Sequence, residues 1–184
     1  MIVILEGLDN CGKNTLTDML CKDYADILRI DFPDYKTAFG MFIKQQLFSN
    51  SLSPISLQLL FSSERLSKAE YLRNISKNHL VITTRYTYTA IAYGIARGID
   101  KRLLEILETE MPMPDKKIYI SISPEESIVR SNNPDLFEKD LKLLKCVETE
   151  YKNIITTEGD WHVVNGMLDL VTVYRDIQSI IFDS

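Results

Sequence analysis

The chain has 184 residues, of which 45% are hydrophobic and 26% charged, and its formal net charge is −5. This length and these proportions of hydrophobic and charged residues are typical of one globular domain and exclude a disordered or fibrous chain. Lys and Arg are not gathered into a block, which argues against a broad cationic face for nucleic acid. We therefore expect a globular protein without a nucleic-acid partner.

The cysteines and the N-terminal residues indicate the compartment. Cys11, Cys21 and Cys146 are odd in number and show no paired spacing, which favours a reducing environment over a disulfide framework. The apolar residues before Glu6 are too few for a signal peptide or a membrane span. We expect a cytoplasmic protein without a membrane partner.

Short apolar runs rich in Ile and Val alternate with segments of helical periodicity along the chain. The apolar runs predict five strands, at 1–6, 28–32, 79–84, 117–123 and 161–164. The periodic segments predict helices at 13–24, 37–48, 54–77, 87–97, 101–109, 124–130, 136–155 and 168–182. Continuously apolar strands between helices are the pattern of a parallel sheet covered on both faces. The sequence thus predicts a three-layer α/β/α fold with a five-stranded parallel sheet, in one domain over 1–184, with a lid loop near 130–138.

One glycine-rich segment follows the first predicted strand and opens the first predicted helix, which is the context of a phosphate-binding loop. It reads Gly7-Leu8-Asp9-Asn10-Cys11-Gly12-Lys13-Asn14-Thr15. Gly7 and Gly12 allow backbone N–H groups to point at phosphate oxygens, and Lys13 supplies a positive charge. Asn14 departs from the pattern, because a Ser or Thr hydroxyl normally reaches magnesium from this position, and Thr15 lies one residue later. We expect a bound nucleoside triphosphate and a fold of the P-loop kinase type.

From Glu6 to Thr15 the loop resembles that of the thymidylate kinase family, which has the form E-G-x-D-x-x-G-K-x-T at the extreme N-terminus. Further matches follow in the family's order: Phe32-Pro33, the LFSSER segment at 60–65, the TRY and AY elements within 84–93, the PMPD segment at 112–115, and a post-lid helix at 135–151. Each match is weak alone, but together they cover nearly the whole chain.

The resemblance implies an activity. A member of this family phosphorylates thymidine monophosphate (dTMP) to the diphosphate with ATP and Mg2+, in dTTP synthesis, and forms a homodimer. Two alternatives stay open: a kinase for dUMP or a 5-modified deoxyuridylate, and a degenerate module that binds a nucleotide without turnover.

The resemblance also implies roles at the acceptor nucleotide. Phe61 would stack on the pyrimidine, and Arg65, one turn later on the same helix face, would donate to a base carbonyl. Arg85, just past the third strand, would bind the acceptor phosphate, because ligands collect at strand ends in open α/β sheets. Thr89 would meet the base edge and Tyr93 the sugar. The expected acceptor set is Asp9, Phe32, Pro33, Phe61, Arg65, Arg85, Thr89 and Tyr93.

For the transfer itself, the resemblance implies that Lys13 bridges the phosphates and that Asp9 holds the acceptor 3′-hydroxyl or a magnesium-bound water. The expected catalytic set is Lys13, Arg85 and Asp9, with Asp9 and Thr15 as candidate metal ligands. Arg130 would lie near the donor adenine or phosphates as part of the lid. The expected ATP-binding set is Gly7, Asn10, Cys11, Gly12, Lys13, Asn14, Thr15 and Arg130.

The chain also departs from the family's pattern. Thr84 stands where the family usually has an Asp that helps to organise magnesium, and Asn10 and Tyr35 stand where many members carry an Arg. A cationic group that neutralises the transition state can be worth roughly three orders of magnitude in rate. Arg85 and Arg130 are the remaining candidates, with Lys36 as a further one, and we expect an active but slow enzyme.

Overall fold

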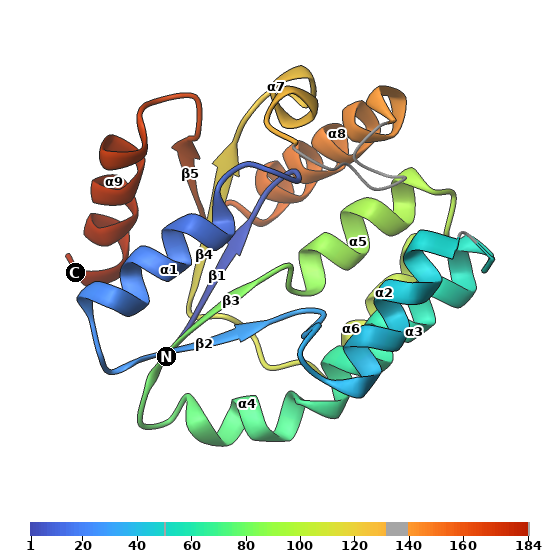
Figure 1. Cartoon of the computed structure of the whole chain (residues 1–184), viewed down its shortest axis with the longest axis horizontal. Helices are drawn as coiled ribbons and strands as arrows, with labels where there is room; N and C mark the ends of the chain where they lie inside the picture. The colour runs from blue at the N-terminus through green and yellow to red at the C-terminus, as the bar shows by residue number, and fades with distance from the viewer. Residues whose placement is uncertain (50, 132–139, 184) are drawn as a thin grey trace.

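The structure is a computed structural model, and it describes residues 1–49, 51–131 and 140–183. Within these residues five parallel strands form one sheet with helices on both faces (Figure 1). The strands are β1 (Ile2–Glu6), β2 (Ile27–Asp31), β3 (Leu80–Thr84), β4 (Lys116–Ser121) and β5 (Trp161–Asn165). The predicted α/β fold with a five-stranded parallel sheet is confirmed.

The strand order β2-β3-β1-β4-β5 sets the place of the site. β1 is central, and all five of its residues are buried. After β1 the chain builds β2 and β3 on one side, and it later adds β4 and β5 on the other. Such a reversal opens a crevice at the carboxyl ends of the central strands, where α/β proteins bind their ligands.

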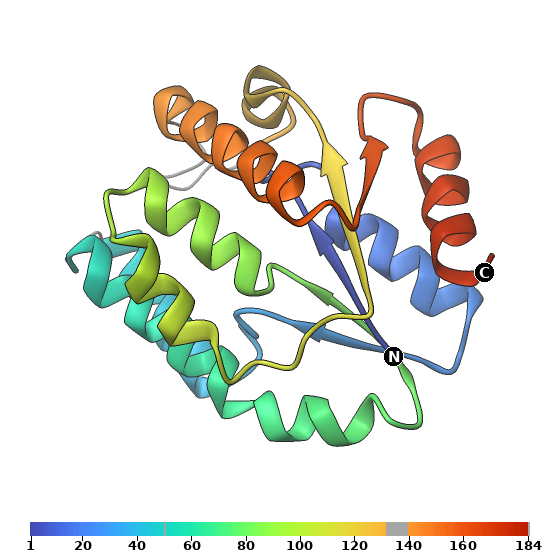
Figure 2. The same ribbon diagram turned by 180° about the vertical axis from the view of Figure 1, so that it is seen from behind.

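The helices cover the sheet in layers (Figures 1 and 2). Their bounds are α1 (Lys13–Asp23), α2 (Ala38–Ser49), α3 (Pro54–Ser67), α4 (Ala69–Ile75), α5 (Thr87–Ala96), α6 (Lys101–Glu108), α7 (Pro124–Val129), α8 (Leu141–Glu158) and α9 (Leu170–Phe182). α1 and α9 lie on one face, and α5 and α8 lie on the other. α3 and α6 pack against α5, and α2 packs against α3. None of the described helices combines the length and apolarity that a bilayer span requires.

Two predicted helices are wrong in their extent. The helix expected over 54–77 is two helices that meet at Lys68, whose backbone N–H bonds to the carbonyl of Arg65 only three residues back, at 3.0 Å. The helix expected to end at 155 continues to Glu158, because the left-handed φ of 74° at Gly159 ends it there. Its expected start at 136 and most of the expected lid loop lie outside the described residues. Every other predicted element matches within two residues at each end.

Candidate active site

The loop after β1 wraps tightly before α1 begins. Gly7 and Gly12 have φ values of 141° and 102°, and Asn10 has 60°. A Cβ at Gly7 would lie 2.6 Å from the carbonyl oxygen of Ile120 in β4, so only glycine fits beside that strand. Since α1 starts directly after Gly12, the loop ends at a helix N-terminus, where backbone N–H groups favour an anion.

Lys13 is anchored inside this loop. Its Nζ donates to the carbonyl oxygens of Gly7 and Leu8 at 2.9 and 2.7 Å and lies 3.4 Å from Sγ of Cys11. The side chain is almost fully buried, and Cys11 is a buried free thiol. Gly7 and Cys11 therefore shape the loop from within, and the ammonium lies at its centre.

A pocket that we call the loop pocket lies over this turn. It is lined by Asn10, Gly12, Lys13, Asn14, Thr15, Arg85 and Arg130. Arg130 follows α7, and its guanidinium donates to Glu126 at 2.7 Å and to the carbonyl of Gly166 at 3.0 Å. It thereby ties α7 to the segment after β5 at the rim of the pocket.

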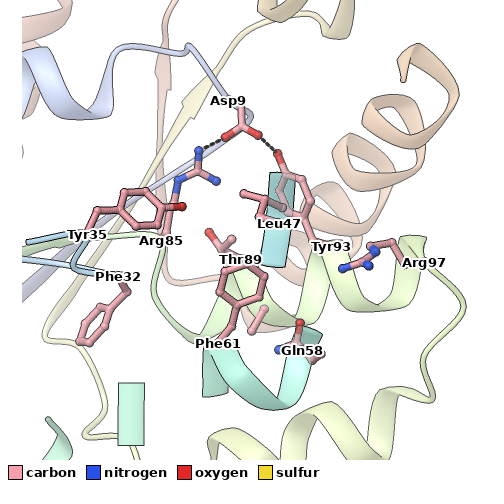
Figure 3. A pocket seen from close by; sticks show the side chains of 11 residues that line it. Asp9, Phe32, Tyr35, Leu47, Gln58, Phe61, Arg85, Thr89, Tyr93 and Arg97 are labelled. Atoms are coloured by element: carbon pink, nitrogen blue, oxygen red, sulfur yellow. Dashed lines mark hydrogen bonds and ion pairs between the residues drawn. The ribbon is translucent and has the colours of Figure 1, made fainter. Parts of the chain in front are cut away.

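A second pocket, the aromatic pocket, adjoins the first (Figure 3). It is lined by Asp9, Phe32, Tyr35, Leu47, Gln58, Phe61, Arg85, Thr89, Ala90, Tyr93 and Arg97. Arg85 lines both pockets, so the structure brings Gly12 and Arg85 to one place, as the sequence predicts.

Asp9 holds two side chains of the aromatic pocket, one of which, Arg85, also lines the loop pocket. Its carboxylate pairs with the Arg85 guanidinium and accepts a hydrogen bond from Tyr93 Oη at 3.0 Å, as Figure 3 shows. Burial opposes the charge of Arg85, but Asp9, with smaller contributions from Tyr93, Tyr35 and Tyr151, outweighs it, and the pKa of the guanidinium is raised. Burial, and then the Asp9 charge, raise the pKa of Tyr93 well above its usual value, so its hydroxyl stays a donor.

Arg85 adopts a backbone conformation that is rare for a side chain of its size. Its φ of 57° lies in the left-handed region, which costs a non-glycine residue about 1 kcal/mol or more. The residue directly follows β3, and its partner Asp9 lies in the loop after β1. The strained turn and the ion pair together direct the guanidinium toward the space between the pockets.

Two predicted acceptor residues, Pro33 and Arg65, are not among those that line the aromatic pocket. Pro33 follows Phe32 through a cis peptide bond. Arg65 is 3% exposed, and its Nε and Nη2 donate to the two oxygens of Glu108 at 2.9 and 2.5 Å. Ser62 also donates to Glu108, at 2.6 Å, so the guanidinium is held between α3 and α6. Direct contact of Arg65 with a base stays a prediction.

Thr89 lines the pocket, but its hydroxyl already contacts a fully buried acid, Glu6, at the end of β1. Tyr151 of α8 donates to the same Glu6 oxygen at 2.9 Å and lies 2.9 Å from the Thr89 hydroxyl. One Glu6 carboxylate oxygen and the hydroxyl oxygens of Thr89 and Tyr151 thus form a ring of three contacts. The two hydroxyls supply only two protons for these three contacts. A protonated Glu6 supplies the third, and burial raises the pKa of this carboxyl above its usual value. Burial and this ring of contacts therefore both favour the protonated form of Glu6.

Glu6 is expected to make stability depend on pH. A raised pKa means that the folded chain holds this proton more tightly, so the contribution is complete below 4.5 and is lost as pH rises through the folded-state value. Glu6→Gln keeps a neutral group in the ring and removes the titration. The free energy of unfolding of the wild type, minus that of the variant, should fall as pH rises above 4.5 in urea titrations. A difference that stays constant or grows over this range would show that Glu6 is ionised.

Gln58 and Arg97, two polar side chains of the aromatic pocket, were not predicted from the sequence. Gln58 precedes Phe61 by three residues on α3, and Arg97 follows Tyr93 by four at the end of α5. Residues three or four apart share a helix face, so helical spacing from the residues already selected was the available signal. Burial lowers the pKa of the Arg97 guanidinium.

A parallel sheet whose central strand leads through a glycine-rich loop into a helix, with an arginine from the neighbouring strand between two pockets, defines a P-loop nucleoside monophosphate kinase. The family model described as thymidylate kinase matches residues 5–177, and the chain belongs to the thymidylate kinase family.

Relatives extend over the same length. The chain is 31% identical to a probable thymidylate kinase of Pyrococcus abyssi, over 97% of this chain and 94% of the relative. It is 28% identical to a thymidylate kinase of Dictyostelium discoideum, over 100% of this chain and 85% of the relative. The solved thymidylate kinase of Candida albicans has the same fold, with a TM-score of 0.83 at 24% identity, over 98% of this chain and 90% of that chain.

Proposed function

We propose that the loop pocket holds the triphosphate of ATP, that the aromatic pocket holds dTMP, and that the terminal phosphoryl group passes between them beside Arg85. The reaction is that of the thymidylate kinase family, to which the chain belongs, and its product feeds dTTP synthesis. One observation carries the assignment: Arg85 lines both pockets and is the residue at which they meet.

The aromatic pocket supports a pyrimidine deoxynucleotide as the acceptor. Phe61 offers a ring for stacking on the base, and Phe32 closes the pocket beside it. Tyr93, fixed by its hydrogen bond to Asp9, would lie against the sugar and disfavour a 2′-hydroxyl. Thr89 would meet the base edge as an acceptor, because its hydroxyl already contacts Glu6.

Three cations would neutralise the transferring group. Lys13 lies at the centre of the loop, Arg85 lies at the junction of the pockets, and Arg130 lies at the rim. On binding, the phosphates would replace the loop carbonyls that now accept from Lys13. Phosphoryl transfer depends mainly on positioning and on charge stabilisation, which these groups supply.

The oxygen ligands near the loop fit magnesium. Within the described residues no cluster of three His, Cys, Asp or Glu side chains could hold a metal ion alone. Mg2+ in kinases needs only one or two protein oxygens, because substrate phosphates and water complete its coordination. Asp9 and Thr15 would supply those oxygens, and the bound ion would neutralise charge on the donor phosphates.

An assay of ADP release tests the proposed function. With ATP and Mg2+, we expect turnover to be faster on dTMP than on dUMP or 5-hydroxymethyl-dUMP, and we expect EDTA to abolish it, since the ion shields the phosphates. A preference for a 5-modified deoxyuridylate would move the acceptor assignment to that substrate. Tight ATP binding without ADP release in the presence of any of these three acceptors would indicate a degenerate module.

We also propose a cytoplasmic homodimer. The adjacent helices α2, α3 and α6 carry exposed large apolar side chains, which are typical of protein interfaces. These are Phe39, Met41, Phe42, Phe48, Leu59, Leu103 and Ile106. The free thiols of the described cysteines support a reducing compartment.

A charge on this surface is expected to separate the subunits. Ile106 is 70% exposed on α6, so Ile106→Glu should leave the fold intact and disfavour burial in an interface. Light scattering after size-exclusion chromatography should then give the mass of one chain. Val171→Glu is the matched control, because Val171 is exposed on α9 at the opposite face of the sheet. A dimer that persists in Ile106→Glu would exclude this surface.

A further inference from the structure

Arg29 on β2 connects the phosphate-binding loop with the tips of β2 and β3. Its Nη2 donates to Oδ1 of Asn14 at 3.0 Å, and its Nε donates to the two oxygens of Asp31 at 2.9 and 2.7 Å. The hydroxyl of Thr84 donates to Asp31 at 3.0 Å, and these two residues are register partners in adjacent strands. A continuous chain of hydrogen bonds therefore runs from β3 to the first turn of α1.

The Asn14 amide has a defined orientation in this network. A guanidinium carries donors only, so the Asn14 atom that faces Arg29 has to be the carbonyl oxygen. The other polar atom is Nδ2, which carries two N–H donors and does not ligate a cation. Asn14 lines the loop pocket, directly after Lys13. It can therefore offer a hydrogen bond to a phosphate oxygen, in place of the hydroxyl that usually reaches magnesium from this position.

Arg29 is held firmly enough to maintain this orientation. Its side chain is 24% exposed, and its two carboxylate partners differ in burial: the side chain of Asp31 is 31% exposed and that of Asp18 is 72% exposed. An ion pair with a mostly exposed carboxylate contributes little. Asp31, itself fixed by Thr84, is therefore the partner that holds the guanidinium.

We propose that Arg29 is a positioning residue, which holds the Asn14 amide so that Nδ2 donates to a phosphate oxygen of the donor nucleotide. The inference rests on the proposed function, in which the loop pocket holds the triphosphate of ATP. Asn14, where the chain departs from the usual phosphate-binding loop, and Thr84, where it departs from its family's pattern, are then the two ends of one network. Any magnesium ion takes its protein oxygens from residues other than Asn14.

EDTA removes Mg2+, so ATP binding measured by calorimetry in EDTA reports the contacts of the protein with the phosphates alone. Asn14→Ala is expected to weaken metal-free ATP binding about tenfold, which corresponds to one hydrogen bond to a charged group. Asn14→Asp keeps an oxygen for Arg29 but puts a second oxygen in place of Nδ2, so it should weaken binding at least as much. The Mg2+ concentration for half-maximal ADP release with dTMP should not change in Asn14→Ala.

A double-mutant cycle tests whether Arg29 acts through the amide. Arg29→Gln should weaken metal-free ATP binding about threefold or more in the wild-type background and should have no further effect in Asn14→Ala. Asp18→Asn, which removes the exposed partner of Arg29, is the matched control and should leave binding unchanged. Urea titration checks that each variant is folded.

Three outcomes would overturn the proposal: unchanged metal-free ATP binding in Asn14→Ala, a higher Mg2+ requirement in the same variant, or additive losses from Arg29→Gln and Asn14→Ala. Asn14 is exposed, so its variants decide whether the amide contacts phosphate even if Arg29→Gln does not fold. A wild-type protein that binds ATP without phosphorylating dTMP would contradict the proposed acceptor alone, because the EDTA measurements do not involve dTMP.

Discussion

Arg85→Ala is expected to lower kcat/KM for dTMP by about three orders of magnitude or more, in line with the loss of a cation that binds the transferring group. The variant removes the residue shared by both pockets. Both positioning of the acceptor phosphate and stabilisation of the transition state should suffer, so kcat should fall and KM for dTMP should rise. Steady-state ADP release at varied dTMP measures both constants.

The control for Arg85→Ala has to distinguish a direct loss of catalysis from a loss caused by destabilisation of the fold. The substitution leaves the buried Asp9 carboxylate without its cation, and that can itself destabilise the fold. Arg85→Ala combined with Asp9→Asn removes the uncompensated charge, and its urea midpoint should return toward that of the wild type. Full turnover in Arg85→Ala would show that the phosphate is held by another residue.

Lys13→Ala is expected to lower kcat by a factor of about 10² to 10³, the usual result of removing one preorganised donor from developing charge. Its ammonium lies within the loop and lines the pocket for the triphosphate. Rapid-quench measurement of the phosphoryl-transfer step at saturating ATP isolates this effect.

Lys22→Ala is the matched control, because Lys22 is an exposed lysine in the last turn of the same helix. It should keep the wild-type rate. A wild-type transfer rate in Lys13→Ala would remove the loop lysine from the mechanism.

The fold could be predicted because its signals are local. The run from Ile2 to Leu5 is apolar at every position, as a strand buried on both faces must be. The loop that follows carries its glycines where the backbone takes positive φ values, at Gly7 and Gly12. Placing this loop between a strand and a helix also placed Lys13 and the N-terminus of α1.

The side-chain partners could not be predicted, because they come from distant parts of the chain. Arg65 and Glu108 are 43 residues apart, and Glu6 and Tyr151 are 145 apart. Helical spacing put Arg65 on the face of Phe61, yet it carries no signal that an acid from α6 would engage the guanidinium. The break at Lys68 was hidden for the same reason, since this lysine pairs with Glu64 of α3 but also with Asp34 in the loop before α2.

The raised pKa of Glu6, at the end of β1, has a consequence for the affinity of the loop. Glu6 interacts electrostatically with Lys13, so an ionised Glu6 would attract the ammonium and compete with the triphosphate for it. A protonated Glu6 exerts no such attraction, so the Lys13 ammonium stays available to the nucleotide. Lowering the pH should not change the charge of a Glu6 that is already protonated. The weaker ATP binding expected at low pH should then follow protonation of the nucleotide.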